Sequence, residues 1–485
     1  MSKFSVYLKQ LLDERGEPIA RIAKNAELER TSIHKALKDE RVLPYTSLKQ
    51  LIQYLQLTLP QVRELNQYYE MLLQGEDIFR AQEAICQLLS ELSQLHFSSG
   101  GNSCFSQEER WRFPGILYGR PQVEAAIQAI LQQETKEKGA QISFHLPQGC
   151  TLSNICSLFW RDGRDFQVHQ LLAFLPNRFG SQTQQENLHL LRKILPLSLM
   201  SGGNYFAYYY FEDSRLLPDI APLSYFVITP HFLITTDSRL SVAQIQDAPE
   251  LIQLYQRRFD QVRSECRALN SYSSDLGHIL ESYMKNTNEA GYYTIMIQPC
   301  LGRYYTRERI ERQFVGDGPK REEMIERIDR RFGMLRSLKD NYYTIFSEEG
   351  LRQFAGDGIV VDLPPEFVPP LDIRLRLELL EAFRQDIQEG VVTACIADME
   401  KLPIPPYLTL TCDPKAGLHI YAVQGFIGGA YACNLHIEES SIGDSFCQFI
   451  KSLPESRFVY PKEKTLAVLD ELIEGLKRER EEERV

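Results

Sequence analysis

Residues 30–38 carry a dense set of side chains that can donate hydrogen bonds or bind anions. Six of them share this property: Arg30, Thr31, Ser32, His34, Lys35 and Lys38. Donors of this kind can contact base edges in the major groove of DNA or the phosphates beside it. Further donors flank the segment where neighbouring phosphates would lie, namely Arg21, Lys24, Arg41 and Tyr45. This chemistry is that of a double-stranded DNA contact.

Short helices must position these donors. Ile33, Ala36 and Leu37 have helical spacing, which predicts a helix over residues 30–38 with those three side chains facing inward. Before it, Gly16 is expected to end a first helix, and Pro18 suits the first turn of a second.

Two more helices are expected after the donor-rich segment. Pro44 breaks the chain, and Thr46 or Ser47 can cap a fourth helix. A fifth helix is predicted to start near Pro60 and to extend through Leu72.

The order of residues 18–57 resembles a known family. The matching segments are Ile22-Ala23, Ala26-Glu27-Leu28, Arg30 to Leu37, Leu43-Pro44, Ser47 to Leu51 and Leu55-Gln56-Leu57. In this order they resemble the helix-turn-helix of the Cro/repressor-type (XRE) transcription regulators. The resemblance implies that residues 30–38 are the helix that reads DNA, and it covers a small part of the 485-residue chain.

Two positions depart from that family pattern. Glu27 occupies the turn position that favours glycine, so either the backbone is left-handed and strained there or the turn differs. Glu29 stands where the recognition helix usually has a Ser or Thr cap. The alternative interpretation is a helical bundle whose polar face only meets water.

Composition and charge limit the function classes. The chain is 43% hydrophobic and 25% charged, as in folded globular proteins, and its length corresponds to roughly three domains. The net charge is −11, yet residues 1–60 carry ten Lys/Arg against seven Asp/Glu, a net of +3 that leaves −14 for the rest. This distribution favours a protein in which only the N-terminal part meets nucleic acid.

Several features favour a cytoplasmic protein without a membrane span. No window approaches about 18 consecutive apolar residues, and the start lacks the apolar segment of a signal peptide. The ten cysteines lack any Cys-x-x-Cys pair, which indicates reduced core residues. We expect no metal site and no cofactor.

The fold class predicted is α+β multidomain, with an all-α helix-turn-helix domain followed by two α/β lobes. The expected domains are 1–75 for DNA binding, 76–114 as helical connector and linker, 115–285 as the first lobe and 290–480 as a second lobe for sensing or oligomerisation. The linker prediction rests on the run Ser98–Ser103. An apolar stripe in the connector should bury against a second copy or against the lobes: Ile78, Ile85, Leu88, Leu89, Leu92 and Leu95.

Alternating helices and strands are predicted for both lobes. The expected strands are 141–146, 168–175, 205–211, 224–229 and 231–236, and then 292–298, 342–346, 391–397, 407–412, 417–423 and 432–438. The order of elements over 120–268 resembles the non-catalytic effector domains related to phospholipase D. That family's His-x-Lys-x4-Asp motif is missing. Two residues after His169 the chain has Leu171, and two residues after His231 it has Leu233, where the motif requires lysine. The two lobes show no repeat at the level of residues.

An aromatic strand is the candidate ligand-binding wall of the first lobe. Tyr205, Tyr208 and Tyr210 lie in the run Tyr205–Phe211 and could line a cup for a small-molecule or peptide effector. The alternative is a strand with one buried face. Between Arg303 and Arg336, ten Lys/Arg mix with seven Asp/Glu, which is typical of a solvated helical face.

The sequence therefore predicts a sequence-specific DNA-binding transcription regulator with a C-terminal sensor and oligomerisation region. It is expected to be a homodimer and not an enzyme, because no catalytic constellation is visible. The alternatives are an enzyme with an N-terminal autoregulatory DNA-binding domain, and a protein-interaction scaffold.

Overall fold

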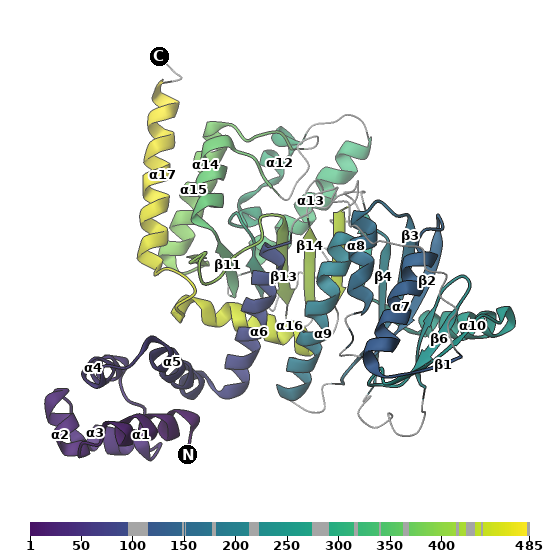
Figure 1. Cartoon of the computed structure of the whole chain (residues 1–485). Helices are drawn as coiled ribbons and strands as arrows, with labels where there is room; N and C mark the ends of the chain where they lie inside the picture. The colour runs from purple at the N-terminus through teal and green to yellow at the C-terminus, as the bar shows by residue number, and fades with distance from the viewer. Residues whose placement is uncertain are drawn as a thin grey trace. The chain divides into compact units, whose positions relative to one another are not determined.

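A computed structural model gives the fold. It describes residues 1–95, 115–147, 150, 152–176, 181–212, 223–273, 291–314, 319–338, 341–361, 368–413, 417–422, 432–437 and 440–482. The predicted linker at 98–103 and the predicted boundary between 285 and 290 lie outside these residues. The chain divides into two compact units, Met1–Glu83 and Ala84–Val485, which we describe separately. The fold class predicted from the sequence is confirmed (Figure 1).

The N-terminal unit is entirely helical. Its helices are α1 (Lys3–Arg15), α2 (Ile19–Asn25), α3 (Arg30–Leu37), α4 (Tyr45–Leu55) and α5 (Leu59–Gln74), and α6 (Glu76–Ser93) begins in it. Phe4, Ile33 and Leu48 are fully buried at the centre of its core. The Tyr69 hydroxyl donates to the Leu43 carbonyl at 2.6 Å, which fastens α5 to the loop before α4.

Local signals explain where these helices begin and end. Ser2 caps α1 by accepting from the Ser5 amide, and Gly16 ends it with φ of +69°. The fourth helix begins at Tyr45, so the predicted caps Thr46 and Ser47 lie inside it. Pro44, with φ of −55° and ψ of 143°, directly precedes the helix and makes no side-chain cap hydrogen bond, so the helix begins one residue before the predicted caps.

The first lobe of the second unit is built on an eight-stranded sheet. Its elements are β1 (Ile116–Tyr118), α7 (Arg120–Glu134), β2 (Ala140–His145), η1 (Leu152–Asn154), α8 (Ile155–Arg161), β3 (Phe166–Phe174), α9 (Ser181–Met200), β4 (Tyr205–Phe211), β5 (Tyr225–Ile228), β6 (Leu233–Thr236), β7 (Val242–Gln246), α10 (Pro249–Glu265) and β8 (Arg267–Ala268). The strand order is β1-β7-β6-β5-β2-β3-β4-β8, with β2, β3 and β4 parallel.

The second lobe is built on a seven-stranded sheet. Its elements are β9 (Asn270–Ser273), β10 (Tyr292–Ile295), η3 (Gly302–Tyr304), α12 (Arg307–Gln313), α13 (Pro319–Ser337), β11 (Tyr342–Phe346), α14 (Glu348–Asp357), α15 (Ile373–Glu389), β12 (Thr393–Ile396), β13 (Leu408–Asp413), β14 (Gly417–Ala422), β15 (Ala432–Ile437), α16 (Ser440–Ser452), η4 (Leu453–Glu455) and α17 (Lys462–Glu482). The strand order is β12-β11-β10-β13-β14-β15-β9, with β10, β11 and β12 parallel.

The two lobes share one topology. In each, three parallel strands join an antiparallel run of three, and the strand that comes first in the chain closes the far edge: β4-β3-β2-β5-β6-β7-β1 corresponds to β12-β11-β10-β13-β14-β15-β9. The correspondence extends further, because β8 pairs antiparallel with β4 and Val459 makes an antiparallel bridge to Ala397, just after β12. The two lobes therefore repeat one topology, which the sequence alone does not reveal.

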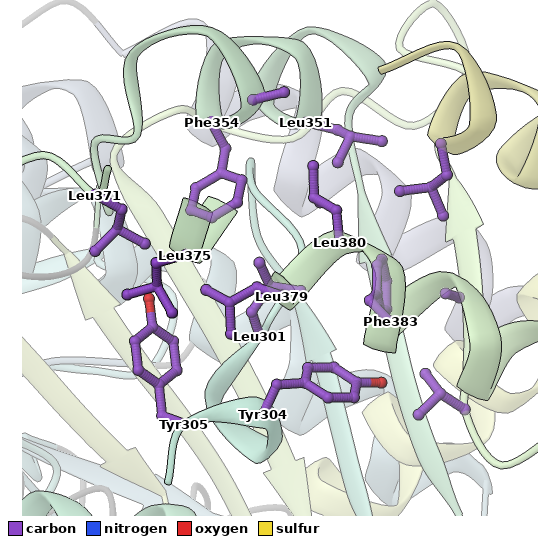
Figure 2. Close-up of a cluster of buried hydrophobic side chains, with 14 of the residues drawn as sticks. Leu301, Tyr304, Tyr305, Leu351, Phe354, Leu371, Leu375, Leu379, Leu380 and Phe383 are labelled. Carbon is purple, nitrogen blue, oxygen red and sulfur yellow. The ribbon is translucent and has the colours of Figure 1, made fainter. Parts of the chain in front are cut away.

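Helices cover both faces of each sheet. In the first lobe, Trp160 of α8 packs its ring against Tyr205, while α10 covers the opposite face through Phe259. In the second lobe, α16 covers one face and the other carries the large apolar core around α15 (Figure 2). Phe383 of α15 lies in that core against Tyr304 and Phe346, with ring centroids 6.0 and 5.9 Å apart.

Residues 267–273 join the two sheets. The segment pairs first with β4 as β8 and then with β15 as β9. At the start of β9, the Asn270 side chain accepts from the Ala207 amide at 2.9 Å and donates to the Tyr205 carbonyl at 2.8 Å. The Tyr272 hydroxyl also donates to Tyr205, so both lobes share a buried polar seam.

The connector helix α6 buries much of the predicted apolar stripe. Ile85, Leu88, Leu89 and Leu92 are at most 1% exposed, Leu95 is half-buried, and Ile78 is 41% exposed. The Leu92 carbonyl accepts from the Tyr407 hydroxyl at 2.6 Å, so this part of α6 is held by the second lobe. Among the described helices, none combines the length and apolarity needed to cross a membrane.

Candidate nucleic-acid interface and ligand pocket

Helix α3 presents its polar side chains on the face opposite its buried residues. Ile33, Ala36 and Leu37 are buried, which fixes the rotation of the helix. Of the predicted donors on α3 and just after it, Arg30, Thr31, Lys35 and Lys38 are exposed, and Ser32 and His34 are half-buried. The flanking Arg21, Lys24, Arg41 and Tyr45 are exposed as well.

The turn between α2 and α3 takes the left-handed form. Glu27 has φ of +55°, a conformation that glycine adopts at lower cost. Two backbone hydrogen bonds hold the turn: the Ala26 amide donates to Ile22 at 2.9 Å, and the Leu28 amide donates to Ala23 at 2.8 Å. Glu29 makes no side-chain cap, so the first turn of α3 leaves amide groups free to meet an anion.

Asp39 anchors the end of α3 to the start of α1. It has φ of +58° and accepts hydrogen bonds from the Ser2 amide and hydroxyl, both at 2.6 Å. Burial raises the pKa of Asp39, but the bonds from Ser2 and Ser5 and the N-terminal ammonium outweigh burial and lower it overall. The charged carboxylate therefore braces the helix that carries the donors.

The cations around α3 differ in how far they are neutralised. The Arg21 Nε atom lies 3.5 Å from the Glu17 Oε2 atom, and the Lys38 Nζ atom lies 3.9 Å from the Glu40 Oε1 atom. By contrast, Lys24, Lys35 and Arg41 form no ion pair within the described residues. Cations without a carboxylate partner can bind phosphate without first breaking an internal contact.

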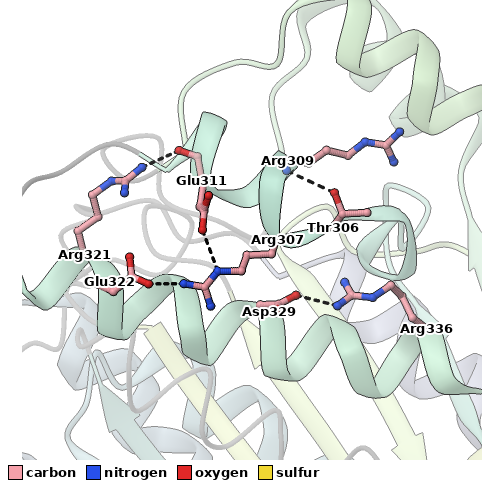
Figure 3. A network of polar contacts seen from close by, with 8 residues as sticks. All are labelled: Thr306, Arg307, Arg309, Glu311, Arg321, Glu322, Asp329 and Arg336. Atoms are coloured by element: carbon pink, nitrogen blue, oxygen red, sulfur yellow. Dashed lines mark hydrogen bonds and ion pairs between the residues drawn. The ribbon is translucent and has the colours of Figure 1, made fainter.

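The second cation-rich run, on α12 and α13, is neutralised internally (Figure 3). Arg307 lies between Glu311 and Glu322, and Arg336 pairs with Asp329 at 2.7 Å. Arg321 donates to the backbone carbonyl of Glu311 at 2.6 Å. These contacts match the interpretation of this run as a charged helical face and distinguish it from α3.

The first lobe contains a cavity of about 360 Å³ at the carboxyl ends of its parallel strands. His145 at the end of β2, Ala173 on β3 and Tyr210 on β4 face it. Ile194 of α9 and Phe259 of α10 close it on either side. Carboxyl ends of parallel strands are the usual place for ligands in α/β sheets, and the volume suits a small molecule.

A polar group lies within this mostly apolar cavity. The His145 Nε2 atom is 3.1 Å from the Tyr210 hydroxyl, and the imidazole stacks on Tyr225 with ring centroids 5.3 Å apart. Burial lowers the pKa of His145, so the ring is neutral at neutral pH. Burial and then the Glu212 carboxylate raise the pKa of Tyr210, which keeps the phenol protonated.

The three predicted tyrosines of β4 lie in different surroundings. Tyr210 lines the cavity. Tyr205 is fully buried on the opposite face of the strand, where its hydroxyl donates to Gln170 at 2.9 Å. Tyr208 shares the face of Tyr210 but is half-buried beside Arg263, whose guanidinium lies 5.8 Å from its ring.

Residues that the sequence did not single out complete the cavity. They are His145, Lys193, Glu212, Tyr225 and Arg258, and they come from β2, α9, the end of β4, β5 and α10. Only contacts between distant segments bring them together. The alternation of side chains along β4 was the one sequence signal pointing to this face.

The two histidines compared with the phospholipase D motif lie apart from a nucleophile arrangement. His231 Nδ1 is 3.2 Å from Glu134, a carboxylate that is almost fully buried. His169 stacks on Phe206, and burial followed by Arg263 lowers its pKa to about 4. Within the part of the chain that the structure describes, no cluster of three or more His, Cys, Asp or Glu could hold a metal ion.

Comparisons with known proteins find no matching family model and no matching curated protein. Among solved structures, the chain is similar to TrmBL2, an archaeal chromatin protein with a novel mode of DNA binding, at 13% identity over 46% of this chain and 70% of that one, with a TM-score of 0.21. It is also similar to the phosphatidylserine synthase of Haemophilus influenzae Rd KW20, at 9% identity over 84% and 98% of the two chains, with a TM-score of 0.24. Neither likeness is close enough to carry an argument about this chain.

Proposed function

We propose that the chain is a sequence-specific DNA-binding transcription regulator that places α3 in the major groove. The observation that carries the proposal is the exposed donor face of α3, held by the buried Ile33, Ala36 and Leu37. Arg30 and Lys35 are its longest donors, and a guanidinium or ammonium at the start of a recognition helix suits guanine.

The surroundings of α3 support the same orientation. Lys24 and Arg41 are exposed on either side of it and form no ion pair within the described chain. They would bind the phosphates that flank the groove, because phosphate contacts set the position of a protein on duplex DNA. The Tyr45 hydroxyl, at the start of α4, would add a further phosphate contact.

The remaining parts of the proposal concern assembly and location. One helix-turn-helix unit reads only a few base pairs, so we propose a homodimer that binds two half-sites about one helical turn apart. The stripe of α6 that could have served a dimer is already buried within one chain from Ile85 to Leu92. Sedimentation of the full chain at micromolar concentration, with and without DNA, tests this state. We propose a cytoplasmic, non-catalytic protein.

The test of DNA reading begins by selecting bound sequences from a random DNA pool with the full chain. Arg30→Ala and Lys35→Ala should each weaken binding to the selected site by about 1–3 kcal/mol for a base-reading contact. Lys24→Ala should weaken all sequences alike and reduce the salt dependence by about one phosphate. Lys9→Ala, an exposed change on α1, is the matched control. Unchanged affinity in both α3 variants at moderate salt would refute the placement of α3.

A further inference from the structure

The cavity of the first lobe offers three kinds of recognition at once. Its apolar walls come from Leu172 on β3 and from Leu190, Ile194 and Leu197 on α9. Its polar lining includes a carboxylate, Glu212, and an ammonium group, Lys193. A ligand that uses the whole cavity therefore needs an apolar part and groups of both charges.

Among the described residues at the end of the cavity near β4, hydrogen-bond acceptors outnumber the protons available to them. The hydrogen bond between His145 and the Ser224 backbone raises the histidine pKa, so the imidazole donates there. Its Nε2 atom then acts as an acceptor, and both Nε2 and the Glu212 carboxylate compete for the single proton of Tyr210. A ligand ammonium would supply the missing donors and a compensating charge, beside aromatic faces that attract cations.

The cationic group lies on the α9 wall. Lys193 is half-buried, and burial lowers its pKa, because the ammonium is partly removed from water. A ligand carboxylate would add a favourable charge contact there. Arg258 of α10, which is exposed, adds a second positive group to the lining.

We propose that this cavity binds a free apolar α-amino acid. Its ammonium would lie against Glu212 and Tyr210, its carboxylate against Lys193, and its side chain against the aliphatic wall of α9. A cavity of about 360 Å³ has room for a leucine, isoleucine or phenylalanine. This inference goes beyond DNA binding and does not depend on it, because the residues involved all belong to the first lobe.

The corresponding place in the second lobe lacks these polar side chains. The Glu212 amide donates to the Phe174 carbonyl at the end of β3, and the Ala397 amide donates to the Phe346 carbonyl at the end of β11, so these positions correspond. Following the strand pairing from there, Tyr210 corresponds to Cys395 and His145 to Tyr293. The first lobe therefore has a histidine and a tyrosine that contact each other at these positions, and the second lobe has a tyrosine and a cysteine there.

The test is isothermal titration of the full chain, without DNA, against L-leucine, L-isoleucine and L-phenylalanine. At least one should bind. For the amino acid that binds, the analogue without the amine and the analogue without the carboxylate, such as 3-phenylpropionate and 2-phenylethylamine for phenylalanine, should each bind at least about tenfold more weakly. L-serine, which has no apolar side chain, should give no heat.

Two variants locate the site. Glu212→Gln should remove the preference for phenylalanine over 3-phenylpropionate, and Lys193→Gln should remove the preference over 2-phenylethylamine. Glu400→Gln, an exposed change after β12 in the second lobe, is the matched control and should bind as the wild type does. Thermal unfolding confirms that each variant is folded. The proposal is overturned if none of the three amino acids binds, if the truncated analogues bind equally well, or if neither variant alters the preference. DNA affinity is measured separately, so this failure is distinct from failure of the α3 proposal.

Discussion

The two lobes share a topology but differ at the carboxyl ends of their parallel strands. In the second lobe, Ser347 alone separates β11 from α14, and its amide and hydroxyl both donate to the Ile297 carbonyl, at 3.1 and 3.0 Å. In the first lobe, residues 175–180 separate β3 from α9, and the cavity lies at the strand ends. In this chain, the one-residue connection brings the start of α14 against the Ile297 carbonyl, whereas the longer connection accompanies an open strand end.

A different device holds the strand end in the first lobe. Asn187, in α9, is 1% exposed and bonds both backbone groups of Leu175: its oxygen accepts from the amide at 3.0 Å and its nitrogen donates to the carbonyl at 3.1 Å. The side chain replaces the direct strand-to-helix contact that Ser347 makes in the second lobe. The end of β3 is therefore held by a side chain from within α9, beside the cavity.

The largest expected effect on stability comes from the start of α14, at the carboxyl ends of the parallel strands in the second lobe. A Cβ added at Gly350, in the first turn of α14, would lie 2.0 Å from the Ile297 carbonyl oxygen. Because a backbone atom cannot rotate away, Gly350→Val should cost at least about 3 kcal/mol of stability. Urea unfolding of the full chain, followed by circular dichroism, measures the loss.

Gly475→Ala is the matched control for that prediction. Gly475 lies in α17, and a Cβ added there meets no heavy atom within 4 Å. The change should stabilise the chain by roughly 0.5–1 kcal/mol, because alanine favours a helix over glycine. Equal effects of the two substitutions would contradict the tight contact between α14 and Ile297, just after β10.

The next largest effect on stability concerns the contact between Asn187 and Leu175 in the first lobe. Asn187→Ala removes both bonds to Leu175 and leaves two buried backbone groups without partners. We expect a loss of about 2–3 kcal/mol in the same unfolding measurement. A loss within experimental error for Asn187→Ala would show that the strand end is held by other contacts.

Much of the fold follows from local sequence signals. The strands Tyr205–Phe211 and Tyr342–Phe346 have the predicted bounds, because each is a short aromatic or β-branched run between turn residues. Helix α3 agrees within one residue with the prediction, since three apolar side chains at helical spacing fix its inner face. The left-handed Glu27 was one of two predicted options for the turn.

Other elements could not be read from the sequence. Helix α16 contains Gly443, which weakens helix propensity and hid the helix. The structure gives the reason for the glycine: a Cβ there would lie 2.7 Å from the Cα of Gly417 in β14. The strands β1 and β8 have too few residues for a periodic pattern, and β9, with the sequence Asn-Ser-Tyr-Ser, lacks apolar alternation.

The shared topology of the two lobes and the cavity of the first lobe both depend on long-range contacts. Corresponding positions such as Glu212 and Ala397 differ in chemistry, so only the pairing of strands relates the lobes. On β4, alternation separates Tyr205 from Tyr208 and Tyr210, as the structure shows. That Tyr210 meets His145 and Glu212 in a cavity depends on how β2 and α9 pack, which no local pattern encodes.

A smaller effect on stability is expected in the second lobe when the pH is lowered. His419, in β14 of the second lobe, is fully buried, and burial, then His436 and Arg331, lower its pKa to about 3. The unfolded histidine has a pKa of about 6.5, so the unfolded state binds the proton first as the pH falls. The stabilising contribution is complete above that value and is lost on acidification, by about 2 kcal/mol between about pH 7 and about pH 5.

The variant His419→Gln tests this contribution. Urea unfolding at both pH values should show a flatter pH dependence for this variant than for the wild type. His34→Gln, in the N-terminal unit, is the matched control and should keep the wild-type slope for unfolding of the body. If the slopes of the wild type and of His419→Gln coincide, buried His419 does not govern the acid sensitivity of the second lobe.

The smallest expected effect on stability comes from filling the cavity. Ala173 of β3 faces the cavity, and the strand register places it where the second lobe has Ile345, which is fully buried. Ala173→Ile therefore puts into the open lobe the side chain that the plugged lobe already holds. Because empty volume is available, the stability change should stay below about 1 kcal/mol, whereas the affinity for the amino acid that binds should fall at least about tenfold.

Ala394→Ile, at a buried position of β12, has no such space and should cost about 1–3 kcal/mol. Unfolding and isothermal titration on the same samples separate the two readouts. A loss of stability at Ala173 equal to that at Ala394 would mean that the first lobe is as closed as the second, and unchanged binding would place the ligand elsewhere.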